Sequence, residues 1–207
     1  MGPVTIFDST LRDGAQGAGV TFSLEDKLQA VRLLDQVGVQ YVEAGNPGSN
    51  PKDAEFFQRA AGLSLKNARL VSFGSTRRKN TAPEEDQSLA AVLAAQTPVC
   101  CVFGKCWKFH VDRVLETSYE ENFRMIEESC RFLKAHGREV IFDAEHFFDG
   151  WKDDPDFAWE ALRTAVRGGA DIVCLCEHQR RRFPPGGRAH CQRGGQPPFR
   201  AGGGPLP

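Results

Sequence analysis

The hydrophobic positions of residues 1–176 fall into six short runs separated by longer segments of helical periodicity. Each run is almost continuously apolar instead of alternating with polar residues, which is typical of parallel strands that are covered on both faces. The runs span residues 4–7, 41–42, 70–73, 99–103, 140–142 and 172–175. They predict six strands of a parallel sheet.

The segments between these runs predict five helices. Residues 23–38 give the clearest signals, because Ser23 suits an N-cap, Asp26 completes a capping pair, and Gly38 suits the C-terminal end. The apolar stripe of this helix consists of Leu24, Leu28, Val31 and Leu34. The other predicted helices span residues 51–61, 83–96, 119–136 and 155–167.

Strict alternation of strands and helices predicts an α/β fold, either a doubly wound sheet or a (β/α)8 barrel of the TIM type. No Gly-x-Gly-x-x-Gly motif follows the first run, which removes the main support for a doubly wound dinucleotide-binding sheet. Polar residues instead follow nearly every run, and a barrel gathers such residues at the carboxyl ends of its strands. They include Asp8, Glu43, residues 75–78, Lys105, Asp143 and Glu145. We therefore expect a TIM-type barrel that is incomplete, since about six of its eight strands are present.

Composition is that of a globular protein and narrows the choice of partners. Apolar residues make up 41% and charged residues 26%, and the net charge of −1 argues against a protein that coats nucleic acid or an anionic membrane. No stretch reaches the roughly 18 apolar residues of a membrane span, and the N-terminus lacks a secretory signal. We expect a cytoplasmic protein with no nucleic-acid or membrane partner, whose seven cysteines are reduced thiols.

Residues 177–207 differ from the rest of the chain in charge and periodicity. They contain six arginines and one acid, so this tail carries +5 and residues 1–176 must carry −6 to give −1 overall. Rich in Gly and Pro, the tail cannot bury enough apolar surface to offset the entropy of ordering it. We expect two regions, a partial barrel over residues 1–176 and a disordered tail over residues 177–207.

The densest group of chemically active side chains follows the first run, at residues 8–16. Arg12 beside Asp13 at a strand end suits a hard divalent cation next to a group that stabilises an oxyanion. A surface ion pair in a turn closed by Gly14 explains the same residues equally well. A zinc site at Cys174 and Cys176 is less favoured, because structural zinc normally needs four ligands and strand cysteines are usually buried.

The segment 8–16 resembles the Asp-x-Thr-Leu-Arg-Asp-Gly-x-Gln signature of a family of metal-dependent barrel enzymes. These enzymes make or break carbon–carbon bonds next to acyl-CoA, and include isopropylmalate, homocitrate and citramalate synthases and hydroxymethylglutaryl-CoA lyases. Segments 41–53, 73–78 and 143–150 resemble the citramalate synthase branch most closely, and the resemblance runs from about residue 4 to residue 176.

The resemblance implies a Claisen-type condensation of acetyl-CoA with pyruvate to (R)-citramalate, in isoleucine and branched-chain amino-acid synthesis. It implies that Asp13 binds a divalent metal ion (Mg, Mn or Zn) and that Arg12 stabilises the developing oxyanion. Glu43 and Glu145 match acidic positions around the substrate, and which of them transfers the proton stays open. Gln16 and Arg77 match positions that orient or bind substrate or CoA. The intact enzymes pair as dimers.

Three alternatives remain at this stage. A larger keto acid would make the protein a 2-isopropylmalate or homocitrate synthase, and a lyase would run the bond cleavage in reverse. The third alternative is a non-catalytic remnant that keeps the strand ends without the metal.

The chain departs from the resembled family after Cys176. Members continue strand six as Asp-Thr-Asn-Gly-Gly and supply a His-x-His metal-binding pair after strand seven. One possible coding of residues 177–184 gives Asp-Thr-Asn-Gly-Gly-Ala-Phe-Pro when a single base is removed. We therefore expect the tail to be a frameshift product and the 207-residue chain to be inactive and poorly soluble. A basic tail that binds nucleic acid is the rival interpretation.

Overall fold

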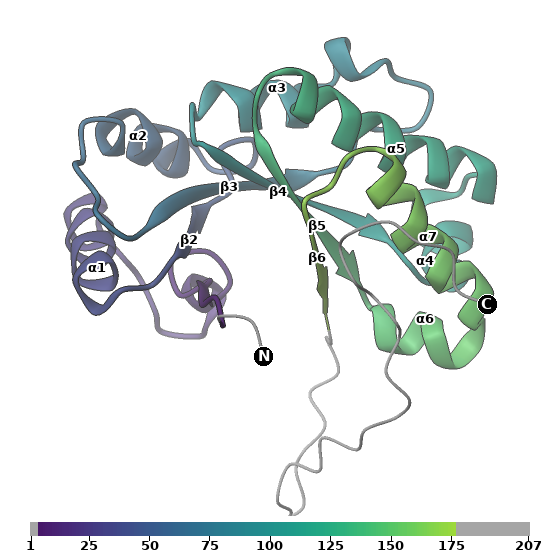
Figure 1. Cartoon of the computed structure of the whole chain (residues 1–207), viewed down its shortest axis with the longest axis horizontal. Helices are drawn as coiled ribbons and strands as arrows, with labels where there is room; N and C mark the ends of the chain where they lie inside the picture. Colours follow the sequence, from purple (N-terminus) through teal and green to yellow (C-terminus); the bar gives the residue numbers. More distant parts are fainter. Residues whose placement is uncertain (1–3, 177–207) are drawn as a thin grey trace, which may run out of the picture.

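A computed structural model describes residues 4–176 and shows one parallel sheet that bends into an arch (Figure 1). The six strands lie in the order β1-β2-β3-β4-β5-β6, so each strand is paired with its neighbour in sequence. The strands are β1 (Phe7–Asp8), β2 (Tyr41–Gly45), β3 (Arg69–Ser75), β4 (Val99–Lys105), β5 (Glu139–Glu145) and β6 (Ile172–Leu175).

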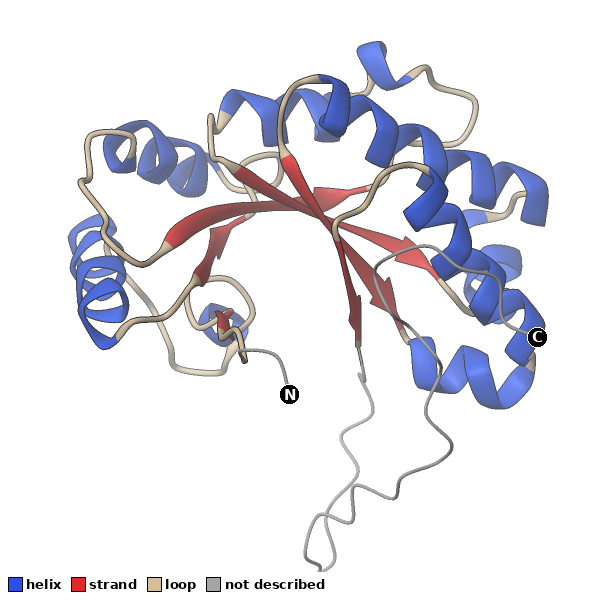
Figure 2. Ribbon diagram, in the orientation of Figure 1, coloured by secondary structure: helices blue, strands red, loops and turns tan. Residues whose placement is uncertain are grey.

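Helices cover the outer, convex face of the arch (Figure 2). The α-helices are α1 (Leu24–Val37), α2 (Pro51–Ala60), α3 (Gln87–Ala94), α4 (Lys108–His110), α5 (Tyr119–Ala135), α6 (Phe147–Asp153) and α7 (Pro155–Arg167). Two 3-10 turns, η1 (Gly14–Gln16) and η2 (Pro83–Glu85), and one π-helical turn, η3 (Val111–Leu115), complete the described elements.

This strand order confirms the barrel-type prediction and excludes the doubly wound sheet. A doubly wound sheet reverses its strand order and carries helices on both faces, whereas here the order never reverses and the helices lie on one face. Among the described residues, β1 and β6 form the two edges of the sheet. The described chain is therefore a part of a barrel wall with six strands.

Alternate residues of the strands pack on opposite faces of the sheet. Residues such as Val102 and Phe142 pack outward against the helices. Residues such as Phe73, Cys101 and Ile141 pack together on the inner face. Because successive side chains of a strand point to opposite faces, the near-continuous apolar runs follow directly from burial on both faces.

The predicted element boundaries were confirmed in several places and wrong in others. Ser23 and Asp26 form the predicted capping box of α1, and Gly38 ends the helix in a left-handed conformation. The predicted first strand was wrong in extent, because pairing with β2 begins at Phe7 and Val4 is 89% exposed at the sheet edge. The helix predicted over residues 83–96 is split at Asp86, whose carboxylate caps α3.

The prediction that the cysteines are buried in strands was correct on β4 and wrong on β6. Cys100 and Cys101 are buried, as is Cys106 beyond the strand. Cys174 is exposed and Cys176 is partly exposed, because β6 is an edge strand and has a neighbour on one side only among the described residues.

The described helices include none that is long and apolar enough to cross a membrane. The tail, with its predicted disorder and frameshift, lies outside the described residues, and the boundary at residue 176 stays a prediction.

Candidate active site

The carboxyl ends of β1 and β2 bring Arg12 and Glu43 into direct contact. Arg12 Nε donates a hydrogen bond of 2.6 Å to Glu43 Oε2, and Nη1 donates to Asp13 Oδ1 at 3.2 Å. The guanidinium lies 3.9 Å from the centre of the Phe73 ring, on the inner face of β3. A carboxylate and an aromatic ring together hold the plane of the guanidinium in one orientation.

A tight turn after β1 positions this arginine. The backbone N–H groups of Arg12, Asp13 and Gly14 all donate to the carbonyl of Ser9. The carboxylate of Asp8 accepts from Thr10 and fixes the start of the turn. The surface-turn interpretation therefore holds for Asp13, whose side chain is 63% exposed, but not for Arg12, which is largely buried against Glu43.

Burial controls the ionisation of Glu43, whose side chain is 0% exposed. Removal from water raises the pKa of Glu43 to about 7, although the charge and the hydrogen bond of Arg12 act in the opposite direction. The net pKa of Arg12 is raised. Burial acts to lower it, but the attraction and the hydrogen bond of Glu43 outweigh that effect. The pair thus combines a permanent cation with a carboxyl group that titrates near neutral pH.

A buried ion pair between α1 and α2 supports β2, the strand that carries Glu43. Lys27 Nζ donates to Asp53 Oδ1 at 2.5 Å and to the carbonyl of Ala44 at 2.9 Å. Gly45 has a φ of +151°, and a Cβ there would lie 2.4 Å from the Asp53 Cγ. Sequence reasoning missed this support, although Lys27 is a charged residue on the buried side of α1.

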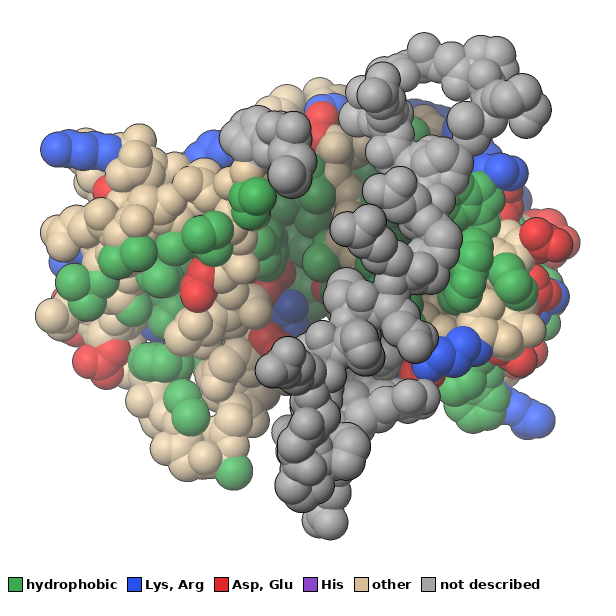
Figure 3. All heavy atoms as spheres, turned by 60° about the horizontal axis from the view of Figure 1, so that its bottom comes forward, with side chains coloured by type: hydrophobic (Ala, Val, Ile, Leu, Met, Phe, Trp, Pro, Cys, Tyr) green, Lys and Arg blue, Asp and Glu red, His purple; other side chains and the backbone are tan. Residues whose placement is uncertain are grey.

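A cavity of about 320 Å³ opens beside Arg12, at the carboxyl ends of the strands. Its wall includes Arg12 and Gln16, two of the residues predicted to bind substrate. Lys27, Lys52 and Asn46 also line it, so the cavity presents several hydrogen-bond donors. The inner face of the arch is hollowed here, with hydrophobic side chains and a few acidic and basic ones in view (Figure 3).

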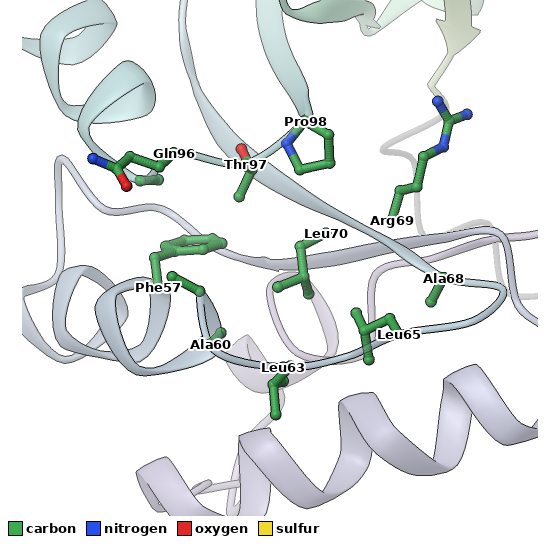
Figure 4. Close-up of a pocket in the computed structure, with 12 residues that line it drawn as sticks. Phe57, Ala60, Leu63, Leu65, Ala68, Arg69, Leu70, Gln96, Thr97 and Pro98 are labelled. Atoms are coloured by element: carbon green, nitrogen blue, oxygen red, sulfur yellow. The ribbon is translucent and has the colours of Figure 1, made fainter.

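A second cavity lies at the opposite end of the strands, and none of the predicted site residues lines it. It has a volume of about 240 Å³ and lies between the end of α2 and the start of β3. Leu63, Leu65 and Leu70 line it (Figure 4). Barrel enzymes carry their chemistry at the carboxyl ends of the strands, which favours the cavity beside Arg12.

The remaining predicted residues do not join the Arg12–Glu43 pair. Glu145 lies at the carboxyl end of β5 and is ion-paired with Lys105 at the end of β4. Arg77 is buried and donates to the carboxylates of Glu121 and Glu128, both on α5. Arg77 therefore ties the end of β3 to a helix, and its predicted contact with substrate or CoA stays a prediction.

The predicted metal ligand, Asp13, has no preformed partners for a metal ion. Among residues 4–176, the one group of three or more side chains with donor atoms within 4.8 Å of one another is Asp143, Cys174 and Cys176. A hard divalent cation takes about six oxygen ligands, and one exposed carboxylate does not supply them. The described residues alone do not fit the expected metal at Asp13.

Proteins of known families match the part of the chain that carries this site. Residues 3–177 match the family described as HMGL-like. The chain is 51% identical to an (R)-citramalate synthase of Aquifex aeolicus over 174 residues, which are 84% of this chain and 33% of that protein. A homocitrate synthase of Methanopyrus kandleri is 34% identical over 170 residues, 82% of this chain and 40% of that protein. The chain spans about a third of the length of the curated citramalate synthases that it matches.

Comparison of structures supports the same fold. A crystal structure of an HMG-CoA lyase from Bacillus subtilis superposes with a TM-score of 0.63 at 17% sequence identity, over 82% of this chain and 56% of that chain. At this identity the match concerns the fold alone.

Proposed function

The chain belongs to the HMGL-like family, and from that premise we propose that it forms part of the catalytic barrel of a citramalate synthase-type acyltransferase. The observation that carries the proposal is the difference in identity between two groups of relatives. Five (R)-citramalate synthases are 44–51% identical to the chain, whereas three homocitrate synthases are 32–34% identical. The proposed reaction condenses the methyl carbon of acetyl-CoA with the keto carbon of pyruvate and releases CoA by hydrolysis of the thioester.

Arg12 is the proposed stabiliser of negative charge in this reaction. Its Nε is held by Glu43 and its face is stacked on Phe73, so the guanidinium needs no reorganisation when an oxyanion forms. Arg12 also lines the cavity of about 320 Å³, where a keto acid of the size of pyruvate fits. The proposal therefore places the keto acid in this cavity, beside Gln16.

Glu43 is the better candidate of the two glutamates for proton transfer. A general base works best when its pKa lies near the working pH, and burial brings the pKa of Glu43 to about 7. Glu145 is instead held by the ammonium group of Lys105. We assign to Glu43 the removal of a proton from the acetyl methyl group, with Arg12 neutralising the enolate oxygen that results.

The divalent metal that the family resemblance implies would polarise the keto group of pyruvate. Asp13 is the residue of the described chain proposed to contact it, and further ligands would have to come from elsewhere. No step assigned to Arg12 or Glu43 depends on it. The proposal also includes a cytoplasmic homodimer that serves branched-chain amino-acid synthesis.

The test is the release of CoA from acetyl-CoA with three keto acids: pyruvate, 2-oxoisovalerate and 2-oxoglutarate. The enzyme is made from a gene in which the proposed frameshift after Cys176 is reversed, and the 207-residue chain is assayed beside it. We expect the restored enzyme to prefer pyruvate and the 207-residue chain to be inactive. Preference for 2-oxoisovalerate or 2-oxoglutarate would contradict the substrate assignment, and activity in the 207-residue chain would contradict the expected inactivity.

Arg12→Lys separates the assigned chemistry from general binding. Lysine keeps the charge but loses the planar group that bonds Glu43 and stacks on Phe73. We expect kcat to fall by about a hundredfold or more. A variant with unchanged kcat would remove Arg12 from the proposed mechanism.

A further inference from the structure

We propose that Asp143, Cys174 and Cys176 form a zinc-binding site at the β5–β6 edge, which uses neither Arg12 nor Glu43 as a ligand. The sheet register explains why these residues meet. Asp143 lies directly opposite Cys174 in the parallel pairing of β5 with β6. Cys176 follows two residues later, so its side chain projects on the same face as that of Cys174.

The positions of the two sulfur atoms suit a tetrahedral metal ion. Cys174 Sγ and Cys176 Sγ are 3.6 Å apart. Two thiolates on one zinc ion, each at about 2.3 Å and at a tetrahedral angle, lie about 3.8 Å apart. The sulfur pair therefore needs almost no movement to hold zinc.

Asp143 supplies the third ligand. The Cys176 thiol donates a hydrogen bond to Asp143 Oδ1, so the carboxylate already faces the sulfur pair. On a zinc ion this oxygen and the Cys176 sulfur would separate to about 3.6 Å, with the ion between them in place of the thiol proton. Binding releases both thiol protons to solvent, and a water molecule completes the fourth position.

Charge and accessibility both favour a cation at this place. Asp143 is 8% exposed and lies close enough to Glu43 for the two carboxylates to repel each other. A divalent ion would offset that repulsion in a poorly solvated region. Cys174 is exposed, which gives an ion a route to the site from solvent.

The donor set distinguishes this site from the hard-cation site expected at Asp13. Thiolates are soft ligands that select zinc and cobalt over magnesium, calcium and manganese. The inference does not rest on the proposed enzymatic function, because it uses none of the residues assigned to the condensation.

Cobalt(II) titration of the complete, reduced 207-residue chain tests the proposal. Cobalt bound by thiolates gives a charge-transfer band in the near ultraviolet, and we expect this band to saturate at one equivalent and to disappear when zinc is added. Magnesium should not displace the cobalt. Absence of the band, or its loss to magnesium, would overturn the proposal.

Single substitutions identify the ligands. Cys174→Ser, Cys176→Ser and Asp143→Asn should each weaken cobalt binding at least about tenfold while circular dichroism keeps the spectrum of the folded chain. Cys174→Ser is the most informative, because this side chain is exposed and its replacement removes no core contact.

Two matched controls complete the test. Cys191→Ser makes the same substitution at a cysteine outside the described residues, and Asp13→Asn removes the carboxylate of the expected hard-cation site; both should bind cobalt like the parent chain. If Cys191→Ser abolished the band, or if all three ligand variants kept it, the metal would be bound elsewhere and the assignment would be wrong.

Discussion

Replacement of Glu43 by glutamine should remove a large pH dependence from the stability of the fold. Glu43 is fully buried, and its pKa in the folded protein is about 7 compared with an ordinary value of 4.5. The folded protein therefore holds this proton more tightly than the unfolded chain does, and the free energy of unfolding falls as pH rises from about 4.5 to about 7. At about 1.4 kcal/mol per pKa unit, the difference amounts to about 3 kcal/mol.

Glutamine keeps the size of the side chain and cannot ionise. The stability of the Glu43→Gln variant should therefore increase relative to that of the parent protein as pH rises. We expect the difference in unfolding free energy, variant minus parent, to increase by about 3 kcal/mol between pH 4 and pH 8. The measurement is urea denaturation followed by tryptophan fluorescence in a buffer free of divalent metal ions.

Glu84→Gln is the matched control, because Glu84 is exposed and should leave the difference constant within about 0.5 kcal/mol. Parallel curves for the Glu43→Gln variant and the parent protein would refute the reasoning, since they would mean that Glu43 is ionised as easily in the folded protein as in the unfolded chain.

Three further predictions concern the stability of the fold. Gly45→Ala should destabilise the protein by about 2 kcal/mol or more in urea denaturation, because its Cβ would collide with Asp53, whereas Gly14→Ala meets only ordinary contacts and should cost less. Lys27→Met should cost about 3–5 kcal/mol in the same measurement by leaving Asp53 buried without its ammonium partner; a cost below about 1 kcal/mol would show that water reaches Asp53. Hydrogen bonds from the backbone N–H groups of Ala68, Asn67 and Lys66 hold the pKa of Asp35 below its usual range, so its stabilisation is present near neutral pH and is lost as pH falls through that lowered pKa. The Asp35→Asn variant should therefore lose little further stability as pH falls. A fall in its free energy of unfolding as steep as that of the parent protein would contradict this.

The sequence predicted the fold class well because the relevant signals are local. Continuous apolar runs predict buried parallel strands, and Ser23, Asp26 and Gly38 mark both ends of α1. The short helices after β4 and β5 were not predicted, because elements as short as α4 and α6 do not show a full helical period. The break at Asp86 was also missed, since a capping side chain within a helical pattern changes no hydrophobic position.

The site was predicted only in part, and the part that was missed has a physical cause. The Arg12–Asp13 motif was visible in the sequence, and the resemblance pointed to Glu43. Their contact and the pKa of Glu43 depend on burial across two strands, which no local pattern encodes. The grouping of Asp143 with Cys174 depends on strand register, because α6 and α7 separate these residues in the sequence and only the pairing of β5 with β6 brings them together.

Carbon–carbon bond formation between acetyl-CoA and isotopically labelled pyruvate tests the central proposal most directly. In an enzyme made from a gene in which the proposed frameshift after Cys176 is reversed, we predict that the label of pyruvate and the acetyl carbons appear together in citramalate, in amounts equal to the CoA released. Arg12→Lys should lower both signals together, by about a hundredfold or more. Release of CoA with the pyruvate label unchanged would show thioester hydrolysis without condensation and would contradict the proposed function.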